Sequence, residues 1–140
     1  MVQYARQHNY RNVMNRYTHI SVEPVSPHVG AQIGGVTLGG TVSNEVVREI
    51  HQAVCEHHVV FFRDQDIAPA DQVAFAQRFG QLRKAVRASF ELVDNLPELS
   101  LLETDRERPP NSDHYHPDGI FRAQPEFASV LRAIIVPKAG

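Results

Sequence analysis

The sequence predicts a mostly β domain with flanking helices. Short apolar stretches of strand length alternate with two segments of helical apolar spacing, and turn residues separate them. A chain of 140 residues has the size of one domain, and 42% hydrophobic residues are enough to build a core. We therefore divide it into a polar N-terminal tail, residues 1–16, and one folded part, residues 17–140.

The first predicted elements are short strands. Residues 17–25 alternate between apolar and polar side chains, with Ile20 and Val22 among polar neighbours, which predicts a strand that Pro24 interrupts. Residues 30–38 contain glycines between small apolar groups. This pattern predicts short strands joined by a glycine turn.

A helix is predicted over residues 44–57. Its apolar side chains recur at helical spacing, Ser43 precedes it as an N-cap, and Glu45 lies in the first turn. His57 and His58 follow each other at its end, so their side chains point in different directions. We interpret them as residues that cap and solvate the helix end rather than as metal ligands.

A buried strand and a second helix come next. The continuous apolar run 59–62 is typical of a buried strand. Pro69 stands where a helix can begin, and Gly80 is a plausible C-terminal stop. The expected apolar stripe of this helix consists of Val73, Ala76 and Phe79.

Two further strands are predicted on either side of a loop. Residues 99–102 form a short strand candidate, and residues 103–113 are polar and contain Pro109 and Pro110, which predicts a loop. Residues 127–136 are a long apolar run and predict a central strand.

Composition limits the partners that we expect. The net charge is −2 and no basic stripe is visible, which argues against a nucleic-acid partner. No apolar run approaches the roughly 20 residues of a membrane span, and the N-terminus lacks the apolar core of a signal peptide. Cys55 is the only cysteine, which suits a reducing compartment. We expect a soluble, cytoplasmic protein.

Three potential metal ligands lie close together in the C-terminal part. His114, His116 and Asp118 are spaced by two, so on a strand their side chains would share one face. Two imidazoles and a carboxylate suit iron(II), leaving positions open for oxygen and a cosubstrate. The spacing alone is a weak signal, and a solvated surface loop stays open as the alternative.

Four blocks, taken in order, resemble the taurine-dioxygenase-like family (TauD/TfdA) of iron(II)/2-oxoglutarate-dependent oxygenases. They are residues 30–36 (GAQIGGV), 60–65 (VFFRDQ), 75–82 (FAQRFGQL) and 116–118 (HPD). The resemblance covers roughly residues 18–140, and four ordered blocks are far more specific than any one of them.

The resemblance implies a fold and a reaction. Residues 17–140 would be the N-terminal portion of a partial double-stranded β-helix, a jelly roll of the clavaminate synthase-like kind. His116 and Asp118 would bind iron(II), with 2-oxoglutarate and molecular oxygen as cosubstrates. The enzyme would hydroxylate a small anionic substrate: taurine or another alkylsulfonate, an alkyl sulfate, or an aryloxyacid.

The resemblance also assigns the substrate pocket. Ser112, His114 and Tyr115 would face it, so His114 is a pocket residue rather than a third ligand. Ala85 stands where taurine-cleaving members carry a histidine, which argues against taurine itself. The cations that could attract an anionic substrate, or simply form a solvated basic turn, are Arg83, Lys84 and Arg87.

The family's distal histidine and its cosubstrate-binding arginine are absent from this chain. We therefore expect a truncated member without oxygenase activity of its own, and a homo-oligomer of the full-length parent stays open. One alternative is a cupin-like metal hydrolase or isomerase that uses His114 and His116 with zinc or manganese. Another is a non-catalytic truncated remnant, or a chain that pairs with a second subunit.

Overall fold

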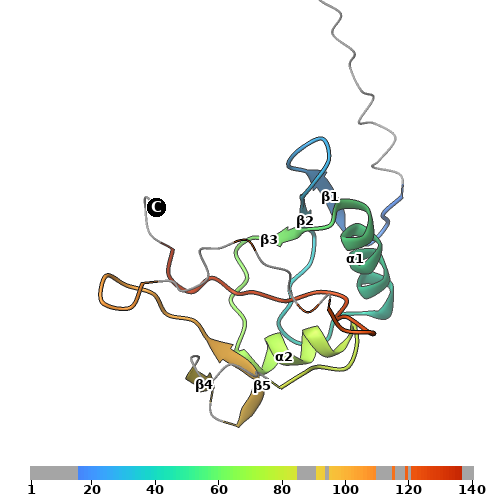
Figure 1. Cartoon of the computed structure of the whole chain (residues 1–140). Coiled ribbons are helices and arrows are strands. Elements are labelled where there is room, and N and C mark those ends of the chain that lie inside the picture. The colour runs from blue at the N-terminus through green and yellow to red at the C-terminus, as the bar shows by residue number, and fades with distance from the viewer. Residues whose placement is uncertain are drawn as a thin grey trace, which may run out of the picture. The chain divides into compact units, whose positions relative to one another are not determined.

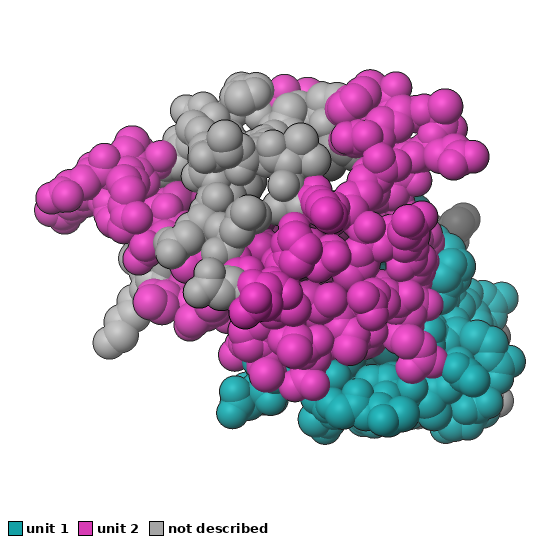
Figure 2. All heavy atoms as spheres, turned by 90° about the horizontal axis from the view of Figure 1, so that it is seen from below, with its two compact units in different colours: residues 1–67 teal, residues 68–140 magenta. Residues whose placement is uncertain are grey.

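The chain forms two compact units, residues 1–67 (the first unit) and residues 68–140 (the second unit), coloured separately in Figure 2. The computed structural model describes residues 16–84, 91–93, 95–109, 115, 119 and 121–136. Within these residues it has five strands and two helices, so the predicted mostly β class with few helices is confirmed (Figure 1). No helix in this described part is long and apolar enough to cross a membrane.

The first unit contains a three-stranded sheet in the order β1-β2-β3. Strand β1 (Ser21–Pro24) pairs antiparallel with β2 (Ala31–Gly34), and β2 pairs parallel with β3 (Val60–Phe62). Val22 lies opposite Ile33, and both side chains are buried. The alternation of apolar residues therefore places one face of the sheet in the core.

Helix α1 (Asn44–His57) is the crossover that makes the β2–β3 pairing parallel (Figure 1). It begins as predicted: the backbone N–H of Val46 donates to Ser43 Oγ at 3.3 Å. Ile50 and Ala53 are almost fully buried, at 1% and 0% exposure. The amphipathic helix expected over 44–57 is confirmed.

The other predictions for the first unit are confirmed in part. The strand expected in 17–25 is only Ser21–Pro24, and of the short strands expected in 30–38 only Ala31–Gly34 forms. Beyond that strand, Leu38 N–H donates to Gln65 Oε1 at 2.8 Å. The prediction of a buried strand at 59–62 is wrong about burial, because Phe61 is 40% exposed. Strand β3 lies at the edge of the sheet, so its apolar run is covered incompletely.

The second unit begins with helix α2 (Pro69–Gln77), with proline in its first turn as predicted. Ala68 is the N-cap and offers no side-chain acceptor, but its own N–H donates to Asp71 Oδ2 at 3.1 Å. The buried side chains of the helix are Gln72 and Phe75.

The predicted stripe of α2 is therefore displaced. Val73, Ala76 and Phe79 are all only half-buried, because the helix turns its 72–75 edge inward. The helix also ends at Gln77, three residues before the predicted stop at Gly80.

A two-stranded antiparallel hairpin follows, with β4 (Glu91–Val93) and β5 (Leu96–Leu101). The strand predicted at 99–102 is confirmed and begins earlier, whereas β4 was not predicted. Residues 102–109 have no regular structure, as expected of the polar loop.

The central strand predicted over 127–136 is wrong. These residues form no strand, and Leu131 and Ile135 are 93% and 88% exposed. A buried strand needs paired neighbours on both sides, and none of the described strands pairs with this run.

Candidate functional site

Most of the predicted metal and pocket residues lie outside the described residues: Ser112, His114, His116 and Asp118. Tyr115 is described and its side chain is fully exposed. The site must therefore be approached from its flanks, which are Gly119 and the segment 121–136.

A cluster of charges holds the segment that follows the predicted ligand pair. Glu126 forms ion pairs with Arg83 and, at 3.7 Å, with Arg122. Arg83 Nη2 also donates to the carbonyl of Gln124 at 3.2 Å. One guanidinium thus contacts two positions of the segment.

Gly119 adopts a backbone conformation that favours glycine. Its φ is +69°, and a Cβ placed there would lie 2.5 Å from Glu126 Oε2. Its carbonyl accepts a hydrogen bond from Arg122 N–H at 3.1 Å, which closes a turn. Gly119 is therefore held in a turn, and the Glu126 carboxylate occupies the space that the Cβ of any larger residue would need.

Helix α2 and the residues just after it also contact the segment 121–136. Phe79 contacts Phe75 edge-on, with ring centroids 5.2 Å apart, and stacks on Phe127 at 6.5 Å. Gln72 Nε2 donates to the carbonyl of Val130 at 3.1 Å. This contact accounts for a buried amide that the apolar spacing did not reveal.

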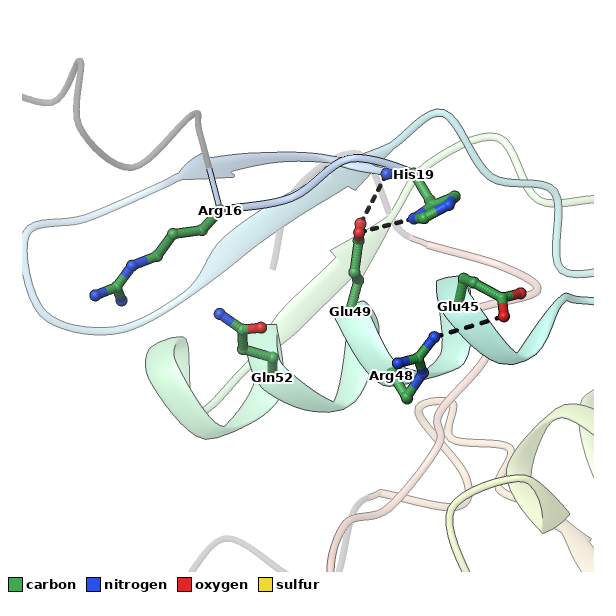
Figure 3. Close-up of a pocket in the computed structure, with 6 residues that line it drawn as sticks. All are labelled: Arg16, His19, Glu45, Arg48, Glu49 and Gln52. Carbon is green, nitrogen blue, oxygen red and sulfur yellow. Dashed lines mark hydrogen bonds and ion pairs between the residues drawn. The ribbon is translucent and has the colours of Figure 1, made fainter.

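A second polar cluster lies in the first unit, where Glu49 on α1 points toward the start of the folded chain (Figure 3). Its carboxylate accepts backbone N–H groups from Thr18, His19 and Ile20 at 2.9–3.1 Å, together with the Thr18 hydroxyl at 2.8 Å. Burial alone would raise the pKa of Glu49, but hydrogen bonds from His19 and Thr18 outweigh it and lower this pKa to about 2. Sequence reasoning missed Glu49, since its partners are about 30 residues away.

The pocket beside Glu49 has a volume of about 180 Å³. The residues that line it are Arg16, His19, Glu45, Arg48, Glu49 and Gln52 (Figure 3). Both arginines of the lining are paired: Arg48 with Glu45 of the same lining at 3.5 Å, and Arg16 with Glu56, outside the lining, at 3.1 Å. We call residues 18–20 the N-terminal segment and interpret the contacts of Glu49 as a tether that holds this segment to α1. The described residues contain no group of three His, Cys, Asp or Glu side chains that could hold a metal.

Comparison with protein families gives a match over most of the chain. The family model described as taurine catabolism dioxygenase TauD, TfdA family matches residues 21–140. This range includes all four sequence blocks and the His116–Asp118 pair.

Individual relatives agree with that match. The chain is 27% identical over 129 residues to an alkylsulfatase of Acinetobacter baylyi, covering 91% of this chain and 39% of the relative. It is 30% identical over 122 residues to an alpha-ketoglutarate-dependent sulfate ester dioxygenase of Pseudomonas putida, covering 86% of this chain and 39% of that protein. The chain therefore spans about two fifths of the length of these curated relatives.

A solved structure is also similar. A taurine dioxygenase from Burkholderia xenovorans is 35% identical, with a TM-score of 0.53, over 57% of this chain and 28% of that one. The similarity thus extends from the sequence to the path of the backbone.

Proposed function

The chain belongs to the taurine catabolism dioxygenase TauD, TfdA family, and from this membership we propose that the protein is an iron(II)/2-oxoglutarate-dependent dioxygenase. The observation that carries the proposal is the family match over residues 21–140, which contains the His-x-Asp pair. We propose further that residues 17–140 form the N-terminal portion of a jelly-roll domain. The relatives described above give no support to the cupin-like alternative with His114 and His116.

His116 and Asp118 are the proposed iron ligands. Their donor set fits the metal: a neutral imidazole and a carboxylate hold iron(II) without saturating it. When bound, iron supplies the activation of oxygen that no amino-acid side chain can perform. His116 would contribute a nitrogen lone pair and Asp118 a negative charge, and a third ligand is not assigned in this chain.

We propose a sulfate ester as the substrate class. The support is the similarity to an alkylsulfatase and to a sulfate ester dioxygenase, together with Ala85 in place of the histidine of taurine-cleaving members. Arg83 is already engaged by Glu126, so Lys84 is the better candidate for attracting an anion. Ser112, His114 and Tyr115 remain the proposed pocket residues.

The location proposed for the protein is the cytoplasm. Cys55 is a free and exposed thiol, which suits a reducing compartment.

The test measures succinate formed by the whole protein from 2-oxoglutarate in the presence of iron(II) and oxygen. An alkyl sulfate should stimulate succinate formation more than taurine or an aryloxyacetate does. His116→Ala and Asp118→Ala should abolish it, whereas the control His28→Ala, an exposed residue of the first unit, should leave it unchanged. The 140-residue chain alone should form no succinate above the blank. Equal activity of His116→Ala and the parent would contradict the proposal.

A further inference from the structure

We propose that the N-terminal segment, residues 18–20, forms a binding site for a small carboxylate. The Glu49 side chain occupies this site in the folded chain, and a free carboxylate such as acetate can bind there when that side chain is removed. The inference is independent of the proposed dioxygenase activity, because every residue that it uses lies in the first unit and none is a proposed metal or pocket residue.

The first step is the convergence of donors on one carboxylate. Three consecutive backbone N–H groups, those of Thr18, His19 and Ile20, donate to Glu49 at 2.9–3.1 Å. The Thr18 hydroxyl donates to Glu49 Oε1 at 2.8 Å, and His19 Nδ1 lies 2.9 Å from the same oxygen. Consecutive backbone N–H groups that point to one spot form a concavity that binds anions. The segment therefore has the donor set of an anion site.

The two oxygens of the ligand have separate partners, and this favours a carboxylate. Oε1 contacts the N–H and hydroxyl groups of Thr18 and the His19 imidazole. Oε2 accepts the backbone N–H groups of His19 and Ile20. A group with two oxygens reaches both sets of donors, whereas a monatomic anion such as chloride reaches only one. We therefore expect the site to select a carboxylate over chloride.

The position of the donors does not depend on Glu49 alone. Tyr17 and Ile20 are buried and anchor the chain in the core of the first unit. A second carboxylate, that of Glu56, accepts the Tyr17 hydroxyl at 2.8 Å and pairs with Arg16 at 3.1 Å. Directly after Ile20, strand β1 pairs with β2. Removal of the Glu49 side chain would therefore leave the donors in place without an acceptor.

A free ligand can reach the donors through the pocket of about 180 Å³ that Glu49 and His19 help to line (Figure 3). The other charged residues of this lining are Arg16, Arg48 and Glu45. Two cations then face one anion once Glu49 is removed, so the lining attracts an anionic ligand.

In the parent protein Glu49 acts as an internal ligand. Its pKa of about 2 keeps it ionised at neutral pH. Because it is attached to α1 beside the donors, its effective concentration there exceeds that of a free anion in solution. The parent should therefore bind no acetate at this site.

The experiment removes the internal ligand and supplies a free one. Glu49→Ala deletes a CH₂–COO⁻ group, which has the same heavy atoms as acetate. The urea midpoint of Glu49→Ala should rise in sodium acetate relative to sodium chloride at equal ionic strength, and the rise should saturate as mass action requires for one site.

Two variants serve as matched controls. Glu49→Gln keeps the site filled with a neutral side chain of the same size, and Glu45→Ala removes an exposed carboxylate from the same helix. Neither control, nor the parent, should respond to acetate more than to chloride.

Nuclear magnetic resonance of the backbone amides supplies a second readout. In Glu49→Ala, the amide signals of Thr18, His19 and Ile20 should shift with acetate and saturate at the concentrations that raise the urea midpoint. Equal responses to acetate and chloride, or an acetate response of Glu49→Gln as large as that of Glu49→Ala, would overturn the inference. A Glu49→Ala variant that stays unfolded in both salts would overturn it too, because the site would then not form without its side chain.

Discussion

The two units of this chain bury their apolar side chains very differently. Among the described residues, the buried hydrophobic side chains lie almost entirely in the first unit, and Phe75 alone represents the second. The exposed large hydrophobic side chains are mostly in the second unit, from Leu101 to Val136. The first unit thus has a core of its own, whereas the described residues of the second unit leave most of their large apolar side chains exposed.

The difference in burial follows from how the strands and helices of each unit are connected to one another. In the first unit a capped helix crosses between two strands that pair with each other, and Glu49 tethers the N-terminal segment to that helix. In the second unit the hairpin β4–β5 and the segment 121–136 share no strand pairing among the described residues. Instead of strand pairing, the segment 121–136 has contacts with α2 and with Arg83.

The largest predicted effect tests this contrast directly. Ile50→Ala should lower the free energy of unfolding by about 2–5 kcal/mol, because it opens a cavity in the core of the first unit. Ile135→Ala, an 88% exposed isoleucine of the second unit, is the matched control and should change it by no more than about 0.5 kcal/mol. Urea denaturation measures both. Similar losses in the two variants would show that the second unit has a core after all.

The next effect concerns the tether. Glu49→Gln should reduce the free energy of unfolding by about 1.5–3 kcal/mol, since a charged acceptor of several N–H groups is lost. Glu45→Gln on the same helix is the control, because Glu45 is exposed. Denaturation at neutral pH compares the two variants, and a loss in Glu45→Gln as large as in Glu49→Gln would remove the special role of the tether.

Lowering the pH should remove the stabilising contribution of the same Glu49 contacts in the parent protein. The folded pKa of Glu49 is about 2, below its ordinary value of 4.5. A depressed folded pKa contributes stability that is complete above about 4.5 and is lost as the pH falls toward 2. The stability difference between parent and Glu49→Gln should therefore shrink across this window. Glu56, whose pKa is lowered by Gln52, Tyr17 and Arg16 despite partial burial, is retained in both proteins and cancels in the difference.

The sequence predicted the elements that local chemistry fixes. Ser43 and Pro69 mark helix starts because a cap or a preset φ acts within one turn. Residues 127–136 were mistaken for a strand because an apolar run does not reveal whether strands pair with it. Strand β4 was missed because its three residues are too few to show an alternation of apolar and polar side chains.

The candidate site likewise has residues that could be proposed from the sequence and contacts that could not. His116 and Asp118 could be proposed from ordered blocks of sequence, which need no knowledge of contacts. The proximity of Gly119, Glu126 and Arg83 could not be predicted in this way. Gly119 and Glu126 are 36 residues or more from Arg83 along the chain. Arg83 was expected either to attract an anionic substrate or to belong to a solvated basic turn, and its ion pair with Glu126 is visible only in three dimensions.

The smallest predicted effect compares one glycine from each unit. Gly40 and Gly119 both have positive φ, +83° and +69°, so alanine at either position should cost about 1–2 kcal/mol of backbone strain. Nothing lies within 4 Å of a Cβ at Gly40, whereas at Gly119 it would displace the Glu126 carboxylate. Gly119→Ala should therefore show an added loss that disappears when Glu126 is also replaced by alanine, and Gly40→Ala should not respond to that replacement. Urea denaturation of the single and double variants measures this coupling. Equal responses of the two glycines to Glu126→Ala would mean that the carboxylate does not restrain the turn. The Glu126 carboxylate would then not distinguish the Gly119 turn of the second unit from the Gly40 turn of the first.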